Sequence, residues 1–465
     1  MKTENILLTS SLLLSAAPAW AMAQEAHADR PNILIILTDD AGYNDFGFMG
    51  SKEILTPRID ALAQEGVIFD DAHVAATVSS PSRACLITGR NGQRFGYECN
   101  LEHESDGLPL TEETIGDVFH NNGYRTAAIG KWHLGTQEGM HPNDRGFDLF
   151  FGMMGGHREY FYNEKGSDAP GSDQNLQLNG KQVKFDGYLT DVFTDKAIEY
   201  INQESDQPFM MYLAYNAVHT PMQATQEDMA RFKGHPRQKL AAMSYALDRG
   251  VGRIIDDLKA SGKYDNTLIF FINDNGGATI NTSNNYPLKG FKGNKFEGGH
   301  RVPCFIVWKG KIIGNRHFDG LSSSLDIFTT AMDAAGIKDS KNHLDGVSLL
   351  PYLQKNKKGD PHKSLFWRKM DSRAMRQGDY KLIMTTGIDT VLYNVRQQVD
   401  ETVDLKEVEP KVFKKMVKAL SRWEDKVCVA PLWEEEAWRK TTNNIHRRLM
   451  NNEIKTYQDM YKKKK

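Results

Sequence analysis

The sequence predicts an α/β protein with a large N-terminal domain, whose mainly parallel sheet is sandwiched by helices, and a smaller C-terminal α+β domain with an antiparallel sheet. Two observations support this fold class. Strand-like and helix-like segments alternate from residue 31 to about 350. The pattern then changes to short strands followed by one amphipathic helix. We therefore expect a large α/β domain over residues 24–354 and a C-terminal α+β subdomain over residues 355–465.

Three apolar runs predict buried strands of the large sheet. They are PNILIILTDD (31–40), PFMMYLAYNAVHTP (208–221) and NTLIFFINDNGG (266–277). In each, a continuous apolar stretch leads into polar residues and a break, which is typical of parallel strands covered on both faces. Between such runs lie helical patterns. TEETIGDVFHNNG (111–123) predicts a helix that opens with a threonine-x-x-glutamate capping box and stops at Asn-Gly.

The C-terminal pattern differs. SLFWRKM, SRAMRQGDYKLIMTT and TVLYNVR, between residues 364 and 396, have the character of short antiparallel strands. EPKVFKKMVKALSRWEDKV (409–427) predicts an amphipathic helix with Pro410 at its start and Phe413, Val417, Leu420 and Trp423 along one face. The final YKKKK is interpreted as a solvated tail.

Composition limits the function classes. At 465 residues, with 40% apolar and 25% charged residues, the chain has the make-up of an ordinary soluble globular protein. A formal net charge of −2 does not indicate nucleic acid or a membrane surface as a binding partner. An anionic substrate must therefore be met by a local cluster of basic groups.

The first 23 residues predict a signal peptide. Lys2 supplies the positive start, an apolar stretch runs from residue 6 to 17, and Ala21-Met22-Ala23 is a small-x-small cleavage site. The apolar stretch is too short to span a bilayer, so no stable membrane insertion is expected. We expect a periplasmic or secreted protein. Its four cysteines are sparse and lack metal-ligand spacing, so isolated buried thiols are expected, with one disulfide of unassigned pairing as the alternative.

Acidic and amide side chains follow two of the predicted strands. Asp39 and Asp40 end the first, and Asp274 with Asn275 ends the third. Ligands of doubly wound sheets bind outside the carboxyl ends of the strands. Three carboxylates brought together there repel one another unless a cation lies between them. The donors are all hard oxygens, which favours Ca²⁺ or Mg²⁺ over zinc.

Basic residues in other segments complete an anion-plus-metal hypothesis. GKWHLG places Lys131 and His133 two residues apart, on one side of an extended segment. His219 follows the second predicted strand, and Lys292 lies in the glycine-rich and lysine-rich KGFKGNKFEGGHRVP. Each alone is more often a surface group; together with the acidic strand ends they indicate a site for an anion and a cation.

The segment VSSPSRACLITGR (78–90) contains a serine whose role the residues alone leave open. Pro81 and the apolar residues after it predict the first turn of a helix, where Ser79 is either a cap or a reactive group. The segment resembles the sulfatase consensus, in which Cys or Ser is followed by x-Pro-Ser-Arg, although Ile87 stands where leucine is commoner. NILIILTDD, GKWHLG, AYNAVHTP, NDNGG and KGNKFEGGHRVP also resemble sulfatase motifs and occur in the family's order. Residues 31–350 thus resemble a type I, formylglycine-dependent sulfatase of the alkaline-phosphatase-like superfamily.

The resemblance implies a site and its chemistry. It implies that Ser79 is oxidised to formylglycine, whose hydrate is the nucleophile, and that Ca²⁺, with Mg²⁺ second, is held at this group. It also implies that Arg83 holds the hydrate, that Lys131 and Lys292 bind sulfate oxygens, that His219 protonates the leaving sugar oxygen, and that His133 is the base that restores the aldehyde. Alternatively, both histidines only bind sulfate. The implied metal ligands are Asp39, Asp40, Asp274, Asn275 and the group derived from Ser79.

The serine itself departs from the commoner pattern, because cysteine is the usual formylglycine precursor. The resemblance then implies a Ser-type maturation enzyme as partner. Either this is a natural Ser-type sulfatase, or Ser79 replaces a cysteine by engineering.

The expected substrate is a sulfated carbohydrate, namely sulfated galactose, N-acetylgalactosamine or another glycosaminoglycan or mucin sugar. Two loops are candidates for reading it: RFGYECN (94–100) and GGHREYFYNEKG (155–166). In the second, His157 and Arg158 either bind sugar hydroxyls or a uronate, or are satisfied within the loop. Two other functions stay open, a phosphoester hydrolase of the same superfamily and a non-catalytic sulfoglycan-binding protein with unmodified Ser79.

Overall fold

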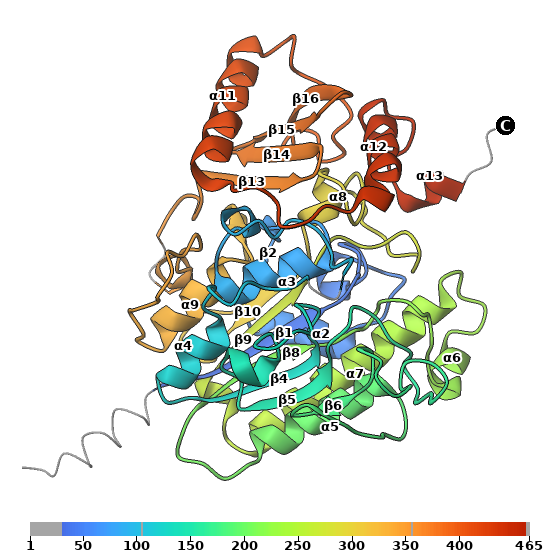
Figure 1. Ribbon diagram of the computed structural model, residues 1–465, viewed down its shortest axis with the longest axis vertical. Helices are drawn as coiled ribbons and strands as arrows, with labels where there is room; N and C mark the ends of the chain where they lie inside the picture. Colours follow the sequence, from blue (N-terminus) through green and yellow to red (C-terminus); the bar gives the residue numbers. More distant parts are fainter. Residues whose placement is uncertain (1–29, 104–105, 355–356, 462–465) are drawn as a thin grey trace, which may run out of the picture.

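The computed structural model describes residues 30–103, 106–354 and 357–461. The predicted signal peptide, residues 1–23, lies outside the described residues. Figure 1 shows a large sheet covered by helices and, above it, a small sheet flanked by α11 and α12. The predicted fold class is confirmed. Within the described part of the chain, no helix has the length and apolarity needed to cross a bilayer.

A ten-stranded sheet forms the large unit, and its central strands are the predicted ones. β9, β1, β8, β4 and β5 lie side by side and pair in parallel, whereas β10 is antiparallel to both of its neighbours. Long apolar runs form this centre because both faces of these strands are covered. The order is β11 (Arg316–Phe318), β2 (Val67–Phe69), β10 (Cys304–Val307), β9 (Thr267–Asn273), β1 (Asn32–Thr38), β8 (Phe209–Ala214), β4 (Arg125–Lys131), β5 (Leu149–Met153), β6 (Gln177–Leu178) and β7 (Lys181–Gln182).

Helices cover both faces of this sheet. Alternate residues of β1 point to opposite sides, so Ile33 and Ile35 join one core with α3, α4 and α9, while Leu34 and Ile36 join the other with α2, α5 and α7. β3 (Ala72–His73) and β12 (Ser322–Ser323) form a separate parallel pair. The helices of this unit are α2 (Pro57–Gln64), α3 (Ser79–Thr88), α4 (Ile115–Asn121), α5 (Leu189–Ile201), α6 (Gln226–Arg231), α7 (Gln238–Ala260), α8 (Glu297–His300), α9 (Asp326–Ala334) and α10 (Leu350–Leu353), with short 3-10 turns at Gly47–Met49, Gly92–Arg94, Pro142–Arg145 and Tyr264–Asn266.

The start of α4 corrects one sequence prediction. The capping box consists of Thr114 and Asp117, which exchange side-chain and backbone hydrogen bonds, and the helix begins at Ile115. The expected box with glutamate at the start of TEETIGDVFHNNG is wrong, because the acid three residues after the capping threonine is an aspartate.

The C-terminal unit is an antiparallel meander of β13 (Ser364–Lys369), β14 (Ser372–Gln377), β15 (Tyr380–Thr385) and β16 (Asp389–Asn394). SRAMRQGDYKLIMTT thus forms two strands, with Gly378 at positive φ in the turn between them. α11 (Pro410–Val427) buries Met416, Leu420 and Trp423 against this sheet. α12 (Glu436–Met450) and α13 (Tyr457–Tyr461) follow.

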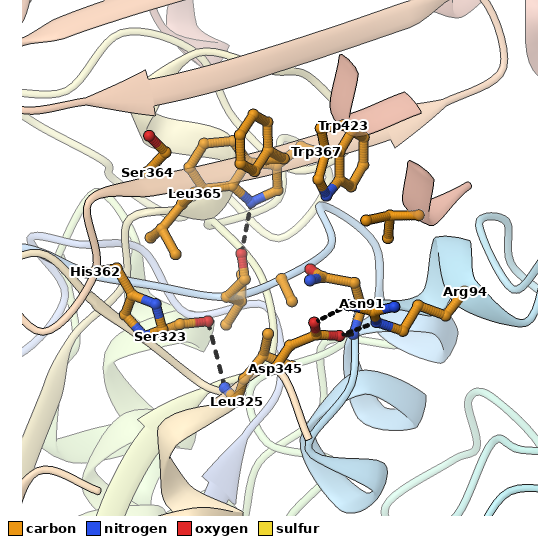
Figure 2. Close-up of a pocket in the computed structure, with 14 residues that line it drawn as sticks. Asn91, Arg94, Ser323, Leu325, Asp345, His362, Ser364, Leu365, Trp367 and Trp423 are labelled. Atoms are coloured by element: carbon orange, nitrogen blue, oxygen red, sulfur yellow. Dashed lines mark hydrogen bonds and ion pairs between the residues drawn. The ribbon is translucent and has the colours of Figure 1, made fainter. Parts of the chain in front are cut away.

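A cavity of about 170 Å³ lies where the two units meet. Figure 2 shows Trp367 and Trp423 on one side of it and Asp345, bonded to Arg94, on the other. The Trp367 indole donates to the carbonyl of Val74 at 2.7 Å, which joins β13 to the large unit. The cavity is therefore part of the junction between the units.

His362, which also lines this cavity, gives a prediction about stability. Its Nε2 lies 2.7 Å from a carboxylate oxygen of Asp326, at the start of α9. Burial alone would lower the pKa of His362, but the Asp326 carboxylate outweighs burial and raises it above 6.5. Because the pKa is raised in the folded state, the stabilisation is fully present below the unfolded-state pKa and is lost as pH rises through the folded-state pKa.

We therefore expect His362→Gln to lower the melting temperature by roughly 2 °C at pH 5.5 and by less at pH 8.5. Differential scanning calorimetry of both proteins at the two pH values measures this. An equal decrease at both would mean that His362 contributes only packing.

Candidate active site

Four neighbouring parallel strands end at one edge of the large sheet, and the predicted functional residues gather there. Asp39 follows β1, Asp274 follows β9, His219 lies in the loop after β8, and Lys131 is the last residue of β4. The loops are joined directly, since the backbone N–H of Asp39 donates to the carbonyl of Ala217 at 2.9 Å. The strand order therefore brings residues far apart in sequence into one site.

The acidic centre consists of Asp39, Asp40, Asp274 and Asn275, all of which are buried. The carboxamide of Asn275 donates to Oδ1 of Asp40 at 2.8 Å, and the backbone N–H of Asp40 donates to Oδ1 of Asp274 at 3.3 Å. Oδ2 of Asp40 is buried with no hydrogen-bond partner. Three carboxylates and a carboxamide thus share one small volume.

Three cations face this acidic centre. Nζ of Lys131 lies 2.6 Å from Oδ2 of Asp39, and Nζ of Lys292 lies 2.7 Å from Oδ1 of Asp40. The Arg83 guanidinium donates to Oδ2 of Asp274 at 2.9 and 3.2 Å, and to the carbonyl of Lys131. Burial would raise the pKa of Asp39 and of Asp40, but these lysines and His219 outweigh it and lower both pKa values. The carboxylates are therefore charged at neutral pH.

Ser79 is the first residue of α3, and its hydroxyl lies on the acidic centre. It donates to Oδ1 of Asn275 at 3.1 Å, with Oδ1 of Asp39 at 3.4 Å. The residue before it, Val78, is the N-cap and is extended, so Ser79 does not cap the helix. The hydroxyl of Ser79 is instead held beside two oxygens of the predicted metal set.

The two histidines have different electrostatic surroundings. His219 donates from Nδ1 to the carbonyl of Thr220 at 2.7 Å, which leaves Nε2 facing Oδ2 of Asp40 at 3.5 Å. Burial lowers the pKa of His219, and the carboxylates of Asp39 and Asp40 oppose that decrease. Burial also lowers the pKa of His133, and there the nearby cations Lys131, Arg83 and Lys292 lower it further. His133 is thus held neutral.

Sequence reasoning missed the residues that fix the loop backbones. The carboxamide of Asn281 donates to the carbonyls of Asp40 and Val218, both at 3.0 Å, and the Ser283 hydroxyl donates to the same Asp40 carbonyl at 2.8 Å. Asp40 has a positive φ of 62°, which is uncommon outside glycine. The only sequence signal for Asn281 and Ser283 is the asparagine-rich segment INTSNN, whose composition is typical of an ordinary loop.

Gly156 provides a test of the position of His133. A Cβ at residue 156 would lie 2.5 Å from Nε2 of His133, so any side chain there pushes the imidazole away. We expect Gly156→Ala to lower kcat/KM about 100-fold with little loss of stability, because a partly exposed ring is displaced and no backbone is in the way. In a His133→Ala background the same change should have almost no further effect. Additive losses in the double variant would contradict this explanation.

The residues of the acidic centre fit a divalent cation. Ligand atoms of Asp39, Asp40 and His219 lie within 4.8 Å of one another, and Oδ2 of Asp40 has no hydrogen-bond partner. Most donors are carboxylate or amide oxygens, the set preferred by Ca²⁺ and Mg²⁺. The lysines beside Asp39 and Asp40 place two positive charges next to these carboxylates.

The two predicted substrate residues of the loop 155–166 differ in exposure. Arg158 is in the interior, with its side chain fully buried and its guanidinium bonded to both carboxylate oxygens of Asp168 and to the carbonyls of Glu159 and Gln174. Its hydrogen-bond donors are thus satisfied within its own loop, which agrees with the alternative that the sequence left open. His157, by contrast, is exposed, with Nε2 3.2 Å from the Gln174 amide.

The other predicted substrate loop, 94–100, is largely buried. Tyr97 and Glu98 are buried, Glu98 is paired with Arg368, and Gly96 accepts a hydrogen bond from Leu432. The C-terminal unit covers this loop, which no local sequence pattern could show.

Comparisons with known proteins identify the family. The Sulfatase family profile matches residues 31–337. An uncharacterized sulfatase of Escherichia coli K12, YdeN, is 37% identical over 73% of this chain and 68% of its own length. N-acetylgalactosamine-6-sulfatase of Mus musculus is 30% identical, over 82% and 75% respectively. The crystal structure of Ps i-CgsB in complex with k-i-k-neocarrahexaose has a TM-score of 0.82 and 37% identity, covering 90% of this chain and 97% of that one.

Fold and site together define a hydrolase of the alkaline-phosphatase-like superfamily. Within that superfamily, the chain belongs to the sulfatase family and is a sulfuric ester hydrolase. A phosphonate monoester hydrolase from Agrobacterium radiobacter is also similar, with a TM-score of 0.65 at 19% identity, which reflects the shared fold alone.

Proposed function

We propose that this protein is an exported sulfatase that removes sulfate from a glycan, with formylglycine made from Ser79 as its nucleophile and Ca²⁺ as its metal. The observation that carries the proposal is the position of the Ser79 hydroxyl, 3.1 Å from the Asn275 carboxamide oxygen and beside Asp39. The carboxylates of Asp39 and of Asp40 in turn contact three cations. The relatives named above support a sulfated sugar as substrate.

The metal would be held by Asp39, Asp40, Asp274 and Asn275. When bound, Ca²⁺ supplies positive charge that polarises a sulfate oxygen and favours ionisation of the hydrated formylglycine. Arg83 fixes the carboxylate of Asp274 through two hydrogen bonds and so holds this ligand in one orientation. The Asn281 amide holds the backbone of Asp40 in place in the same way.

The two active-site lysines would bind sulfate oxygens. Lys131 is fully buried at the end of β4, whereas the side chain of Lys292 is 21% exposed. Nζ of each contacts a carboxylate oxygen, which keeps both cations in the site. A sulfate ester that enters with the metal in place accepts hydrogen bonds from both, which orients its sulfur toward residue 79.

The histidines would divide the proton transfers. His219 donates from Nδ1 to a backbone carbonyl, which leaves Nε2 facing the site, 3.5 Å from Oδ2 of Asp40. Burial lowers the pKa of His219, and the Asp39 and Asp40 carboxylates offset this decrease in part. We assign His219 as the acid that protonates the departing sugar oxygen. His133, surrounded by cations and held neutral, is assigned as the base that accepts the hydroxyl proton of the nucleophile as sulfate leaves.

Export rests on residues 1–23, which we propose are removed as a signal peptide. The N-terminal sequence of protein recovered from the periplasm or medium of the native host tests this. A mature chain beginning at residue 24 is expected, and an uncleaved Met1 would contradict export by this route.

The substrate proposal is tested by a desulfation screen. Protein matured in the native host is incubated with galactose and N-acetylgalactosamine carrying one sulfate at each ring position, alone and within disaccharides, and with 4-nitrophenyl sulfate. Release of sulfate from at least one sugar is expected. Hydrolysis of the aryl ester without any sugar sulfate would contradict a glycan substrate.

A further inference from the structure

A large polar cleft opens beside the proposed site. It has a volume of about 800 Å³, within the range of small-ligand sites. Its wall includes Leu101, Glu102, His103 and Asp106, and residues from the segments 135–141 and 171–180. We call it the acidic cleft, because it is lined by Glu102, Asp106 and Asp173, and none of its described lining residues is lysine or arginine.

Each wall of the acidic cleft is connected to the proposed active site. The segment with Glu102 follows Asn100, whose side-chain oxygen accepts from the backbone N–H of Ser80 at 3.1 Å. Gly135 lies two residues after His133. The carbonyl of Asp173 accepts from the N–H of Gly155 at 2.7 Å, and a Cβ on the next residue, Gly156, would lie 2.5 Å from Nε2 of His133. The walls of the cleft therefore adjoin the segments that carry Ser79 and His133.

Polar groups in the cleft are free to bind a ligand. Asn175 is only 6% exposed, and its side-chain Oδ1 has no hydrogen-bond partner among the described residues. The carboxylates of Glu102 and Asp173 are on exposed residues and make no hydrogen bond or ion pair within the described part of the chain. Asp106, in contrast, is buried and accepts from the backbone N–H groups of Glu102 and His103, so it shapes the wall.

The charges of the cleft and of the site are opposite in kind. The site presents Lys131, Lys292 and Arg83 to an anion, whereas the cleft presents carboxylates and a carboxamide oxygen. Such oxygens accept hydrogen bonds from sugar hydroxyls. A carboxylate or second sulfate on the neighbouring sugar would instead meet like charge.

We propose that the acidic cleft binds an uncharged, hydroxyl-rich sugar joined to the sulfated one, and that Glu102 and Asp173 discriminate against a neighbour that carries a uronate carboxylate or a second sulfate. This inference rests on the proposed glycan sulfatase function and narrows its substrate class. It disfavours those glycosaminoglycan disaccharides in which the neighbouring sugar is a uronate.

The test compares paired disaccharides in which N-acetylgalactosamine 4-sulfate or 6-sulfate is joined either to galactose or to glucuronate. For the matured wild-type enzyme, we expect kcat/KM to favour the galactose member at least about tenfold. Asp173→Asn and Glu102→Gln should each lower the ratio of kcat/KM for the galactose member to kcat/KM for the glucuronate member about threefold. The double variant should lower this ratio further. Asp206→Asn, an equal change of charge on an exposed loop before β8 at the opposite end of the sheet, should leave the ratio unchanged.

Three results would overturn the inference: equal or better hydrolysis of the glucuronate member, a ratio that the two cleft variants do not move, or failure to hydrolyse either member by enzyme that cleaves 4-nitrophenyl sulfate. A protein shown to carry formylglycine that cleaves none of these esters would instead contradict the proposed function. Melting temperatures of the variants verify that each one is folded.

Discussion

Ser79→Ala is expected to abolish sulfatase activity while leaving the protein folded. The substitution removes the oxygen from which the proposed nucleophile is made, and loss of a nucleophile lowers kcat by about 10⁴-fold or more. The structural cost is small, because the Ser79 hydroxyl makes one hydrogen bond of 3.1 Å and a longer contact of 3.4 Å. Removing it costs about 1 kcal/mol. Sulfate release and a thermal melt measure the two effects.

Ser79→Cys is the matched control for this variant. Made in a host with a Cys-type maturation enzyme, it should acquire formylglycine and show activity, because the rest of VSSPSRACLITGR is intact. Ser79→Ala made in the same host should stay inactive. Activity of Ser79→Ala within tenfold of the wild type would exclude residue 79 as the source of the nucleophile.

Asp40→Asn is expected to have the second largest effect, a decrease of about 10³-fold in kcat/KM and a loss of Ca²⁺ binding. Asp40 is fully buried, and its Oδ1 accepts from both Lys292 and Asn275. The variant keeps the shape but removes one of the charges that would hold a divalent cation, and it leaves Lys292 without its partner. Isothermal titration with CaCl₂ gives a readout that does not depend on maturation of Ser79.

The control for Asp40→Asn is again Asp206→Asn, which changes the net charge equally on the exposed loop before β8. It should bind Ca²⁺ and hydrolyse substrate as the wild type does. Unchanged Ca²⁺ affinity of Asp40→Asn would mean that the cation is held elsewhere. A weakened affinity with normal turnover would mean that the metal does not take part in the reaction.

The centre of the site could be predicted because the sequence pattern shows where the buried strands end. Continuous apolar runs identify β1, β8 and β9, and the parallel arrangement sends their carboxyl ends to one edge. Asp39, His219 and Asp274 therefore lie close together, as expected. Their catalytic and metal roles, and the domain boundary at 354/355, stay predictions.

Contacts between segments that are distant in the sequence could not be predicted from the sequence pattern. Arg158 resembles a sugar-binding residue in an exposed loop, but Asp168, ten residues later, neutralises it in the interior. The loop 94–100 is covered by residues near 430, a contact that depends on how the C-terminal unit packs. The amide of Asn281 donates hydrogen bonds to two backbone carbonyls. No spacing or periodicity in the sequence indicates this role.

The central claim is that residue 79 carries the nucleophile as formylglycine. Peptide mass spectrometry of protein purified from the native host tests it most directly. Oxidation of serine to the aldehyde removes two hydrogens, so the peptide with Ser79 should be about 2 Da lighter than its sequence mass. The account predicts this loss in active protein. An active protein in which Ser79 is entirely unmodified would contradict it.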